Sequence, residues 1–170
     1  MALSSRELES TFGELLNKVE ILSDRSEISE LSGGLTNRNL KIQTPDANYV
    51  ARISSNESAL LAIDRQAEYE NSKIAAEIGI GAPVHDYLPN QGLLVISYIS
   101  GKTFNSKDVA ANLPRIAKSV RQLHSAKPFV RDFDMFKIQQ NYLKIVKEKG
   151  FKIPKGYEEF EKYRLELLKA

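Results

Sequence analysis

The sequence predicts an α+β fold in which strands dominate roughly the first 100 residues and helices dominate the rest. Two observations lead to this expectation. Five short runs with strand character surround a single long helical pattern in the front part of the chain. Only helical patterns follow them. After a leading helix, the expected order is therefore β-β-β-α-β-β and then helices alone, with two lobes joined near residues 99–102.

The leading helix is expected over residues 4–20, because Ser4 or Ser5 can cap it and its apolar residues recur at helical spacing. The extended runs are residues 26–31, 38–43, 49–53, 82–88 and 93–99. The motif PDAN forms a hairpin turn between the second and third runs, and PNQG joins the last two. The long helix is expected from about residue 60 to residue 77, where Gly79 and Gly81 stop it.

Three helices are expected in the back part of the chain. They cover residues 114–125, residues 136–149, and the segment after Pro154 to the end. Pro114 suits the first turn of the first of these helices.

Composition and charge narrow the function classes. A net charge of +2 over 170 residues gives no electrostatic argument for binding nucleic acid or a membrane surface, and the basic residues are dispersed among acids. The absence of cysteine excludes disulfides and thiol chemistry. No apolar run approaches the ~20 residues of a membrane span, and the polar start MALSSRELES is not a signal peptide. We therefore expect a cytoplasmic protein.

Two adjacent glycines, Gly33 and Gly34, lie between the first two extended runs. Glycine allows a ligand to approach the main chain closely, and successive N–H groups in such a loop can cradle an anion. An ordinary hairpin turn is the alternative, since glycine is also a default turn residue.

The third run, YVARI, places an arginine among apolar residues. Val50 and Arg52 face one side of the strand, while Tyr49, Ala51 and Ile53 face the other. A buried arginine needs an anionic partner. Glu70 falls on the apolar stripe of the following helix, whereas Glu68 is expected on a different face, so we expect Arg52 to pair with Glu70. In the alternative, both side chains extend to water.

A glycine loop, a basic residue on the third strand and an acidic residue on the next helix form the set with which kinases hold nucleotide phosphates. The segment SYISGKT, which begins within the fifth run, would then be the hinge, where an adenine ring bonds to main-chain groups.

Four motifs carry a resemblance to a known family: LSGGLTNRN, YVARI, IDRQAEYENSKIAAEIGIGAPV and VISYISGKTF. Together they resemble the choline/ethanolamine kinases, in particular the LicA-like branch. These enzymes are related to the aminoglycoside phosphotransferases and have a protein-kinase-like fold. The resemblance covers residues 27–104 and, more weakly, residues 123–129. It implies a kinase-like N-lobe, made of a five-stranded antiparallel sheet and one long helix, followed by the first helices of an incomplete helical C-lobe.

The resemblance also implies a domain organisation. A nucleotide-binding lobe would cover residues 1–98, a hinge residues 99–104 and a partial helical lobe residues 105–170. The loop of residues 33–39 would cover the ATP phosphates, Arg52 would replace the usual kinase lysine, and Glu70 would orient it. The implied nucleotide-contacting residues are Gly33, Gly34, Leu35, Thr36, Asn37, Arg38, Asn39, Arg52, Glu70, Ser97, Tyr98 and Ile99.

The implied reaction is phosphoryl transfer from ATP, with Mg²⁺, to the hydroxyl of a small alcohol. Choline or ethanolamine is the first choice as the phosphate acceptor. Fructosamine, thiamine, homoserine and an aminoglycoside remain alternative acceptors, because the aromatic residues Tyr87 and Tyr98 give little information about which alcohol binds. A non-catalytic binding or regulatory module with a kinase-like front lobe is the rival hypothesis. A nucleic-acid-binding domain has little support.

The catalytic motifs of this family, H-x-D-x-x-x-x-N and a later D-x-D or D-x-E, are not found. HDYLPN at residues 85–90 has the wrong spacing and is expected to be a strand and its turn. Asp132 or Asp134 in RDFD is expected to cap a helix. His124 is expected to end a helix. No cluster has metal-ligand spacing, so we assign no catalytic residue and no metal ligand in this chain.

The chain is therefore expected to end inside the helical lobe, as a fragment, one product of a split gene or a degenerate kinase. This chain alone is expected to be inactive. Leu165, Leu167 and Leu168 would then be exposed, which favours self-association.

Overall fold

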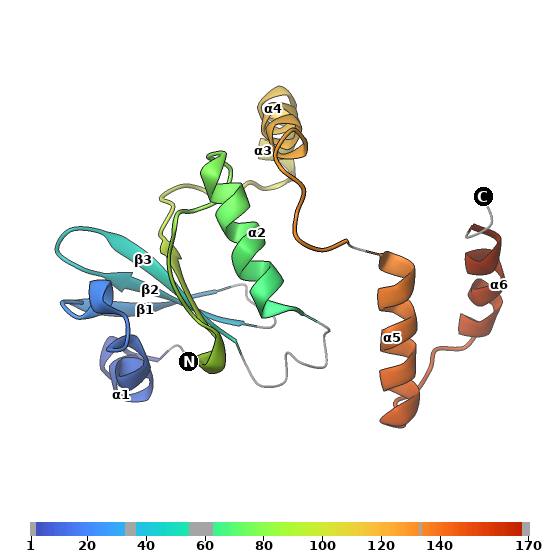
Figure 1. Cartoon of the computed structure of the whole chain (residues 1–170), viewed down its shortest axis with the longest axis horizontal. Helices are drawn as coiled ribbons and strands as arrows, with labels where there is room; N and C mark the ends of the chain where they lie inside the picture. Colours follow the sequence, from blue (N-terminus) through green and yellow to red (C-terminus); the bar gives the residue numbers. More distant parts are fainter. Residues whose placement is uncertain (1–2, 33–36, 55–62, 133, 168–170) are drawn as a thin grey trace. The chain divides into compact units, whose positions relative to one another are not determined.

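Figure 1 shows a computed structural model of the chain, which describes residues 3–32, 37–54, 63–132 and 134–167. The chain divides into two compact units, and each is described by itself. One comprises Met1–Asn56 and Asp64–Arg131, and the other comprises Glu57–Ile63 and Asp132–Ala170. The lobe boundaries predicted at residues 98 and 104 stay predictions.

The first unit contains a five-stranded antiparallel sheet, as the sequence predicts. The strand order is β1-β2-β3-β5-β4, so β5 lies between β3 and β4. The strands are β1 (Glu27–Leu31), β2 (Asn37–Gln43), β3 (Asn48–Ser54), β4 (Val84–Leu88) and β5 (Leu93–Ser97). The predicted hairpin turn between β2 and β3 is closed by a 2.9 Å hydrogen bond from the N–H of Thr44 to the carbonyl of Ala47. A short 3₁₀ turn, η3 (Pro89–Gln91), joins β4 to β5.

One face of this sheet is covered by α1 (Ser5–Leu16), drawn in blue in Figure 1. Ser4 caps the helix, and a reciprocal bond with Glu7 completes a capping box. The helix ends at Leu16 rather than at the predicted residue 20, and a 3₁₀ turn, η1 (Glu20–Leu22), follows. The main core lies between these elements and the sheet: Leu8, Leu16, Val19, Leu22, Ile28, Leu40, Ile42, Ala51, Leu93 and Val95.

The long helix α2 (Arg65–Glu77) begins later than the predicted residue 60, because Asp64 is extended and its carboxylate accepts the N–H of Ala67, which caps the helix there. Its end at Glu77 is as predicted. Gly79 follows with φ +72°, the left-handed conformation that terminates helices. Tyr69 of α2 stacks on Tyr87 of β4 with ring centroids 4.5 Å apart, which fixes the helix against the sheet.

Two further helices belong to the first unit. The helix α4 (Leu113–His124) was predicted, and α3 (Ser106–Ala111) was not. The missed signal is a capping box formed by Asn105 and Asp108. The segment after α4 contacts α2, since the N–H of Val130 donates to the Asn71 side chain at 3.0 Å.

The second unit contains α5 (Met135–Glu148) and α6 (Tyr157–Leu167). Asp134 caps α5 by accepting the N–H groups of Phe136 and Lys137, so the predicted capping role is confirmed for this residue. Leu167 is exposed, as predicted, whereas the predictions for the Leu165 side chain and for Leu168 fall outside what the structure describes. In the described part of the chain, no helix combines the length and apolarity that crossing a bilayer requires.

Candidate functional site

The strand β3 presents two different faces, as its alternation predicts. Ala51 is fully buried in the core under α1, and Arg52 therefore points to the opposite face of the sheet. On that face Arg52 lies between Asn39 of β2 and Leu94 of β5, which are its partners in register. The candidate site is built around this arginine.

Arg52 forms an ion pair with a carboxylate of α2, and the carboxylate is that of Glu68. The distance from Arg52 Nη1 to Glu68 Oε1 is 2.6 Å, and the two side chains are 33% and 21% exposed. The predicted pairing with Glu70 is wrong. Glu70 instead accepts a hydrogen bond from Gln66 at 3.2 Å and lies 3.6 Å from Lys73 Nζ.

The error has a geometric cause. Ala67 and Ile74 mark the buried side of α2, and with about 100° of rotation per residue Glu70 lies nearer to this side than Glu68 does. The arginine, however, reaches the flank of the helix, where water still contacts the ion pair. Glu68 is in fact the less exposed of the two carboxylates, at 21% against 36% for Glu70, so the apolar stripe alone does not locate the side of α2 that faces Arg52.

A second arginine holds the same carboxylate. Arg65, the first residue of α2, donates from Nη1 to Glu68 Oε2 at 2.6 Å and from Nη2 to Asn37 Oδ1 at 2.9 Å. A sequence signal could have identified Glu68 as the partner. It lies three residues after Arg65 and in the first turn of the helix, where an acidic residue is favourable.

The electrostatics of this group favour an anion. Burial acts to raise the pKa of Glu68, but the hydrogen bonds from Arg65 and Arg52 outweigh it, so the pKa lies below the ordinary value. The carboxylate is therefore ionised at neutral pH, and two guanidinium groups share one negative charge. Arg52 Nε is buried and has no hydrogen-bond partner among the described residues. The group thus combines a net positive charge with an unused donor.

The residues after the glycine loop divide between the two faces of the sheet. Asn37 and Asn39 lie on the face of Arg52, since they alternate with Arg38 along β2. Arg38 points to the other face, where Nε donates to Glu30 at 2.9 Å and the guanidinium lies 5.4 Å from the Phe12 ring centroid. The structure therefore does not bring Arg38 to the site. Gly33, Gly34, Leu35 and Thr36 lie outside the described residues.

The predicted hinge follows β5 directly. The N–H of Ser97 donates to the Pro83 carbonyl and the N–H of Tyr98 to the Asn48 carbonyl, both at 2.9 Å. The Lys41 ammonium lies 4.7 Å from the ring centroid of Tyr98. Because both N–H groups are bonded within the sheet, Ser97 and Tyr98 can offer a base only their carbonyl groups or side chains. Ile99 is exposed.

Comparison with known families gives a match over most of the chain. The model of a family described as a phosphotransferase enzyme family matches residues 27–168. The chain belongs to this phosphotransferase family. None of the curated proteins matches the sequence significantly.

Solved structures of kinases share the phosphotransferase fold of this chain. The choline kinase LicA from Streptococcus pneumoniae is similar with a TM-score of 0.74 and 22% identity, over 97% of this chain and 55% of that one. A choline/ethanolamine kinase family protein from Mesorhizobium loti has a TM-score of 0.71 and 23% identity, over 92% and 51% of the two chains. LicA in complex with AMP gives a TM-score of 0.71 and 23% identity, over 97% and 56%. The chain thus spans about half the length of these structures.

The part of a phosphotransferase site that handles the metal is not found among the described residues. No group of three or more His, Cys, Asp or Glu side chains there could hold a metal ion. The rejected motif HDYLPN lies on β4 and in η3, and His85 Nε2 is hydrogen bonded to Ser97 Oγ at 2.7 Å. His124 is the last residue of α4, as predicted.

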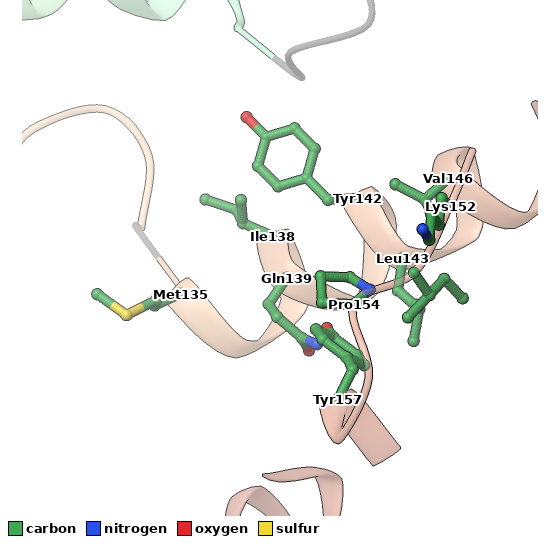
Figure 2. Close-up of a pocket in the computed structure, with 10 residues that line it drawn as sticks. Met135, Ile138, Gln139, Tyr142, Leu143, Val146, Lys152, Pro154 and Tyr157 are labelled. Atoms are coloured by element: carbon green, nitrogen blue, oxygen red, sulfur yellow. The ribbon is translucent and has the colours of Figure 1, made fainter.

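The second unit contains an apolar cavity of about 330 Å³ between α5 and the segment before α6, shown in Figure 2. Its lining is Met135, Ile138, Gln139, Tyr142, Leu143, Val146, Lys152, Ile153, Pro154 and Tyr157. None of the predicted nucleotide-contacting residues is among them. The lining contains no acidic residue.

Proposed function

We propose that this chain carries the nucleotide-binding part of an ATP-dependent small-molecule kinase that transfers phosphate to an alcohol. The observation that carries the proposal is the ion pair between Arg52 and Glu68. It lies on the sheet face opposite the core and takes the place of the strand lysine and helix glutamate with which kinases hold phosphates. The family supports a phosphotransferase function.

The proposed nucleotide contacts follow from the chemistry of the site. Arg52 would donate to the phosphate oxygens, since the planar guanidinium fork suits phosphate and the side chain is one-third exposed. Asn37 and Asn39 lie on the same face, and the loop of residues 33–36 precedes them along the chain. Ile99 would supply a main-chain contact to adenine, beside the carbonyl groups of Ser97 and Tyr98. A related structure contains AMP, which supports an adenine nucleotide.

Choline or ethanolamine is the proposed acceptor. The support is that the similar structures are named a choline kinase and a choline/ethanolamine kinase family protein. Thiamine, fructosamine, homoserine and aminoglycosides are alternative acceptors, because no described residue of this chain selects among them. A cytoplasmic location is part of the same proposal, and Mg²⁺ is the metal that phosphoryl transfer from ATP uses.

Calorimetric titration with ATP and with adenosine tests the nucleotide-binding part. We expect the protein to bind ATP, and Arg52→Met to weaken that binding by roughly 10-fold or more while adenosine affinity stays unchanged, since a hydrogen bond to a charged group contributes about 1.5–3 kcal/mol. Arg25→Gln is the matched control. Arg25 is 6% exposed and pairs with Glu9 of α1, away from the site. The proposal fails if ATP does not bind or if Arg52→Met leaves its affinity unchanged.

A non-catalytic nucleotide-binding module is the second candidate. The observation that favours it is the lack of a metal-ligand group among the described residues. A transfer assay with labelled ATP, Mg²⁺ and a panel of alcohols separates the two candidates. Phosphorylation of any alcohol by this chain alone would reject the module, whereas ATP binding without transfer would support it for the chain as given.

A further inference from the structure

Arg65 connects three elements of the site through one side chain. Its side chain is 18% exposed, and its two terminal nitrogens contact Glu68 on its own helix and Asn37 at the start of β2. Asn37 directly follows the loop of residues 33–36. Glu68 in turn contacts Arg52 on β3. A chain of three hydrogen bonds thus runs from the end of the glycine loop to the proposed phosphate-binding cation.

The two arginines use their donors differently. Arg65 commits Nη1 to Glu68 and Nη2 to Asn37. Arg52 donates from Nη1 to Glu68, and the Nε–H groups of both arginines are buried without a partner among the described residues. Recruiting the end of Arg65 to a bound phosphate would cost one of its two contacts, and Arg52 is the more exposed of the two side chains, at 33% against 18%.

The carboxylate of Glu68 depends on both arginines for its orientation. Oε1 accepts from Arg52 and Oε2 from Arg65, so each oxygen is held by one guanidinium. A carboxylate held at one oxygen alone rotates about its last side-chain bond, because that torsion is broad. Removing Arg65 would release this rotation and loosen the anchor of Arg52, although Arg52 itself is untouched.

We propose that Arg65 is a positioning residue that fixes Glu68, and through it Arg52, for binding of nucleotide phosphates. This inference rests on the proposed function, and it adds that Arg65 acts through Arg52 rather than on the phosphates. Removing Arg65 should weaken the binding of ATP and leave the binding of adenosine unchanged, because adenosine has no phosphate.

A double-mutant cycle of Arg52→Met and Arg65→Met, read as ATP and adenosine affinity by calorimetry, tests this mode of action. We expect Arg65→Met to weaken ATP binding by about 10-fold, equivalent to about 1.4 kcal/mol, with adenosine affinity unchanged. The double variant should bind ATP no more weakly than Arg52→Met, within about 2-fold. Unchanged ATP affinity in Arg65→Met, or losses that multiply in the double variant, would overturn the proposal.

Two milder variants keep the test valid if Arg65→Met does not fold. Asn37→Ala removes one of the two contacts and should weaken ATP binding by roughly 3-fold, since a neutral hydrogen bond contributes about 0.5–1.5 kcal/mol. Arg65→Lys should restore only part of the affinity, because a lysine lacks the guanidinium fork that reaches both partners. Full affinity in both variants would overturn the proposal. Arg25→Gln again controls for a lost buried arginine.

Titration of the Glu68 carboxyl by NMR separates this inference from the proposed function. In Arg65→Met we expect the pKa of Glu68 to rise towards its ordinary value, and in Arg25→Gln to stay as in the parent protein. If the protein binds neither ATP nor adenosine, the proposed function is wrong. The titration still tests whether Arg65 fixes the Glu68 carboxylate. An unchanged pKa of Glu68 in Arg65→Met would overturn the positioning role.

Discussion

The two faces of the sheet differ although the same strands build both. Ala51 is fully buried beneath α1, and its neighbour Arg52 is one-third exposed and paired with a carboxylate. The face under α1 carries the main core of apolar side chains. The opposite face carries three hydrogen bonds between Asn37, Arg65, Glu68 and Arg52.

Under the proposed function, the two faces divide stability from nucleotide binding. Burial of apolar surface is non-directional and stabilises the sheet regardless of the detailed contacts. Hydrogen bonds to charged groups depend on direction, and they set the geometry that a phosphate would meet. We therefore expect substitutions under α1 to change stability, and substitutions on the Arg52 face to change nucleotide binding.

The largest expected effect is on the face under α1. Leu40→Ala removes a fully buried side chain from the core and should lower the free energy of unfolding by about 3 kcal/mol. Urea unfolding measures this loss. ATP affinity per folded molecule should stay unchanged, and a parallel loss of affinity would show that the two faces are not independent.

The next effect distinguishes the two glutamates of α2. Glu68→Gln leaves two guanidinium groups without their anion and should cost about 2 kcal/mol of stability, below the value for a fully buried pair because water reaches this one. ATP affinity should fall as well. Glu70→Gln should change stability by less than about 0.5 kcal/mol, as surface substitutions do. Equal losses in the two variants would contradict the observed pairing.

A smaller effect is expected at the start of α1. Ser4→Ala removes the N-cap and both of its side-chain bonds, which should cost about 1 kcal/mol. Ser10→Ala, an exposed position inside the same helix, is the matched control. Thermal unfolding of the two variants measures the difference, and no difference between them would refute the capping role.

The smallest expected effect is a pH dependence on the Arg52 face. The pKa of Glu68 is lowered in the folded protein from the ordinary value of 4.5, so its contribution to stability is complete above that pH and is lost as the pH falls through the folded pKa. The stability difference between the parent protein and Glu68→Gln should therefore shrink only below about pH 4.5. A difference that stays constant down to pH 3 would contradict the lowered pKa.

The sequence predicted the face under α1 better than the Arg52 face. Alternation along β3 correctly separated Ala51 from Arg52, because period-two patterning reports directly which side is apolar. The apolar stripe of α2 did not identify Glu68, because it does not locate the flank of the helix that a long arginine reaches, whereas the spacing of Arg65 and Glu68 could have. The glycine-loop motif also did not predict which face of the sheet Arg38 lies on. The alternation along β2 places Arg38 on the face opposite Arg52.

The proposed function depends on Arg52, on the face of the sheet opposite α1, binding nucleotide phosphates. The most direct measurement is the NMR spectrum of arginine Nε–H groups during addition of ATP, with the Arg52 signal assigned from Arg52→Lys. We predict that the Arg52 signal shifts with ATP and not with adenosine, while the Arg25 signal under α1 stays in place. An Arg52 signal that is unmoved at saturating ATP would contradict the account.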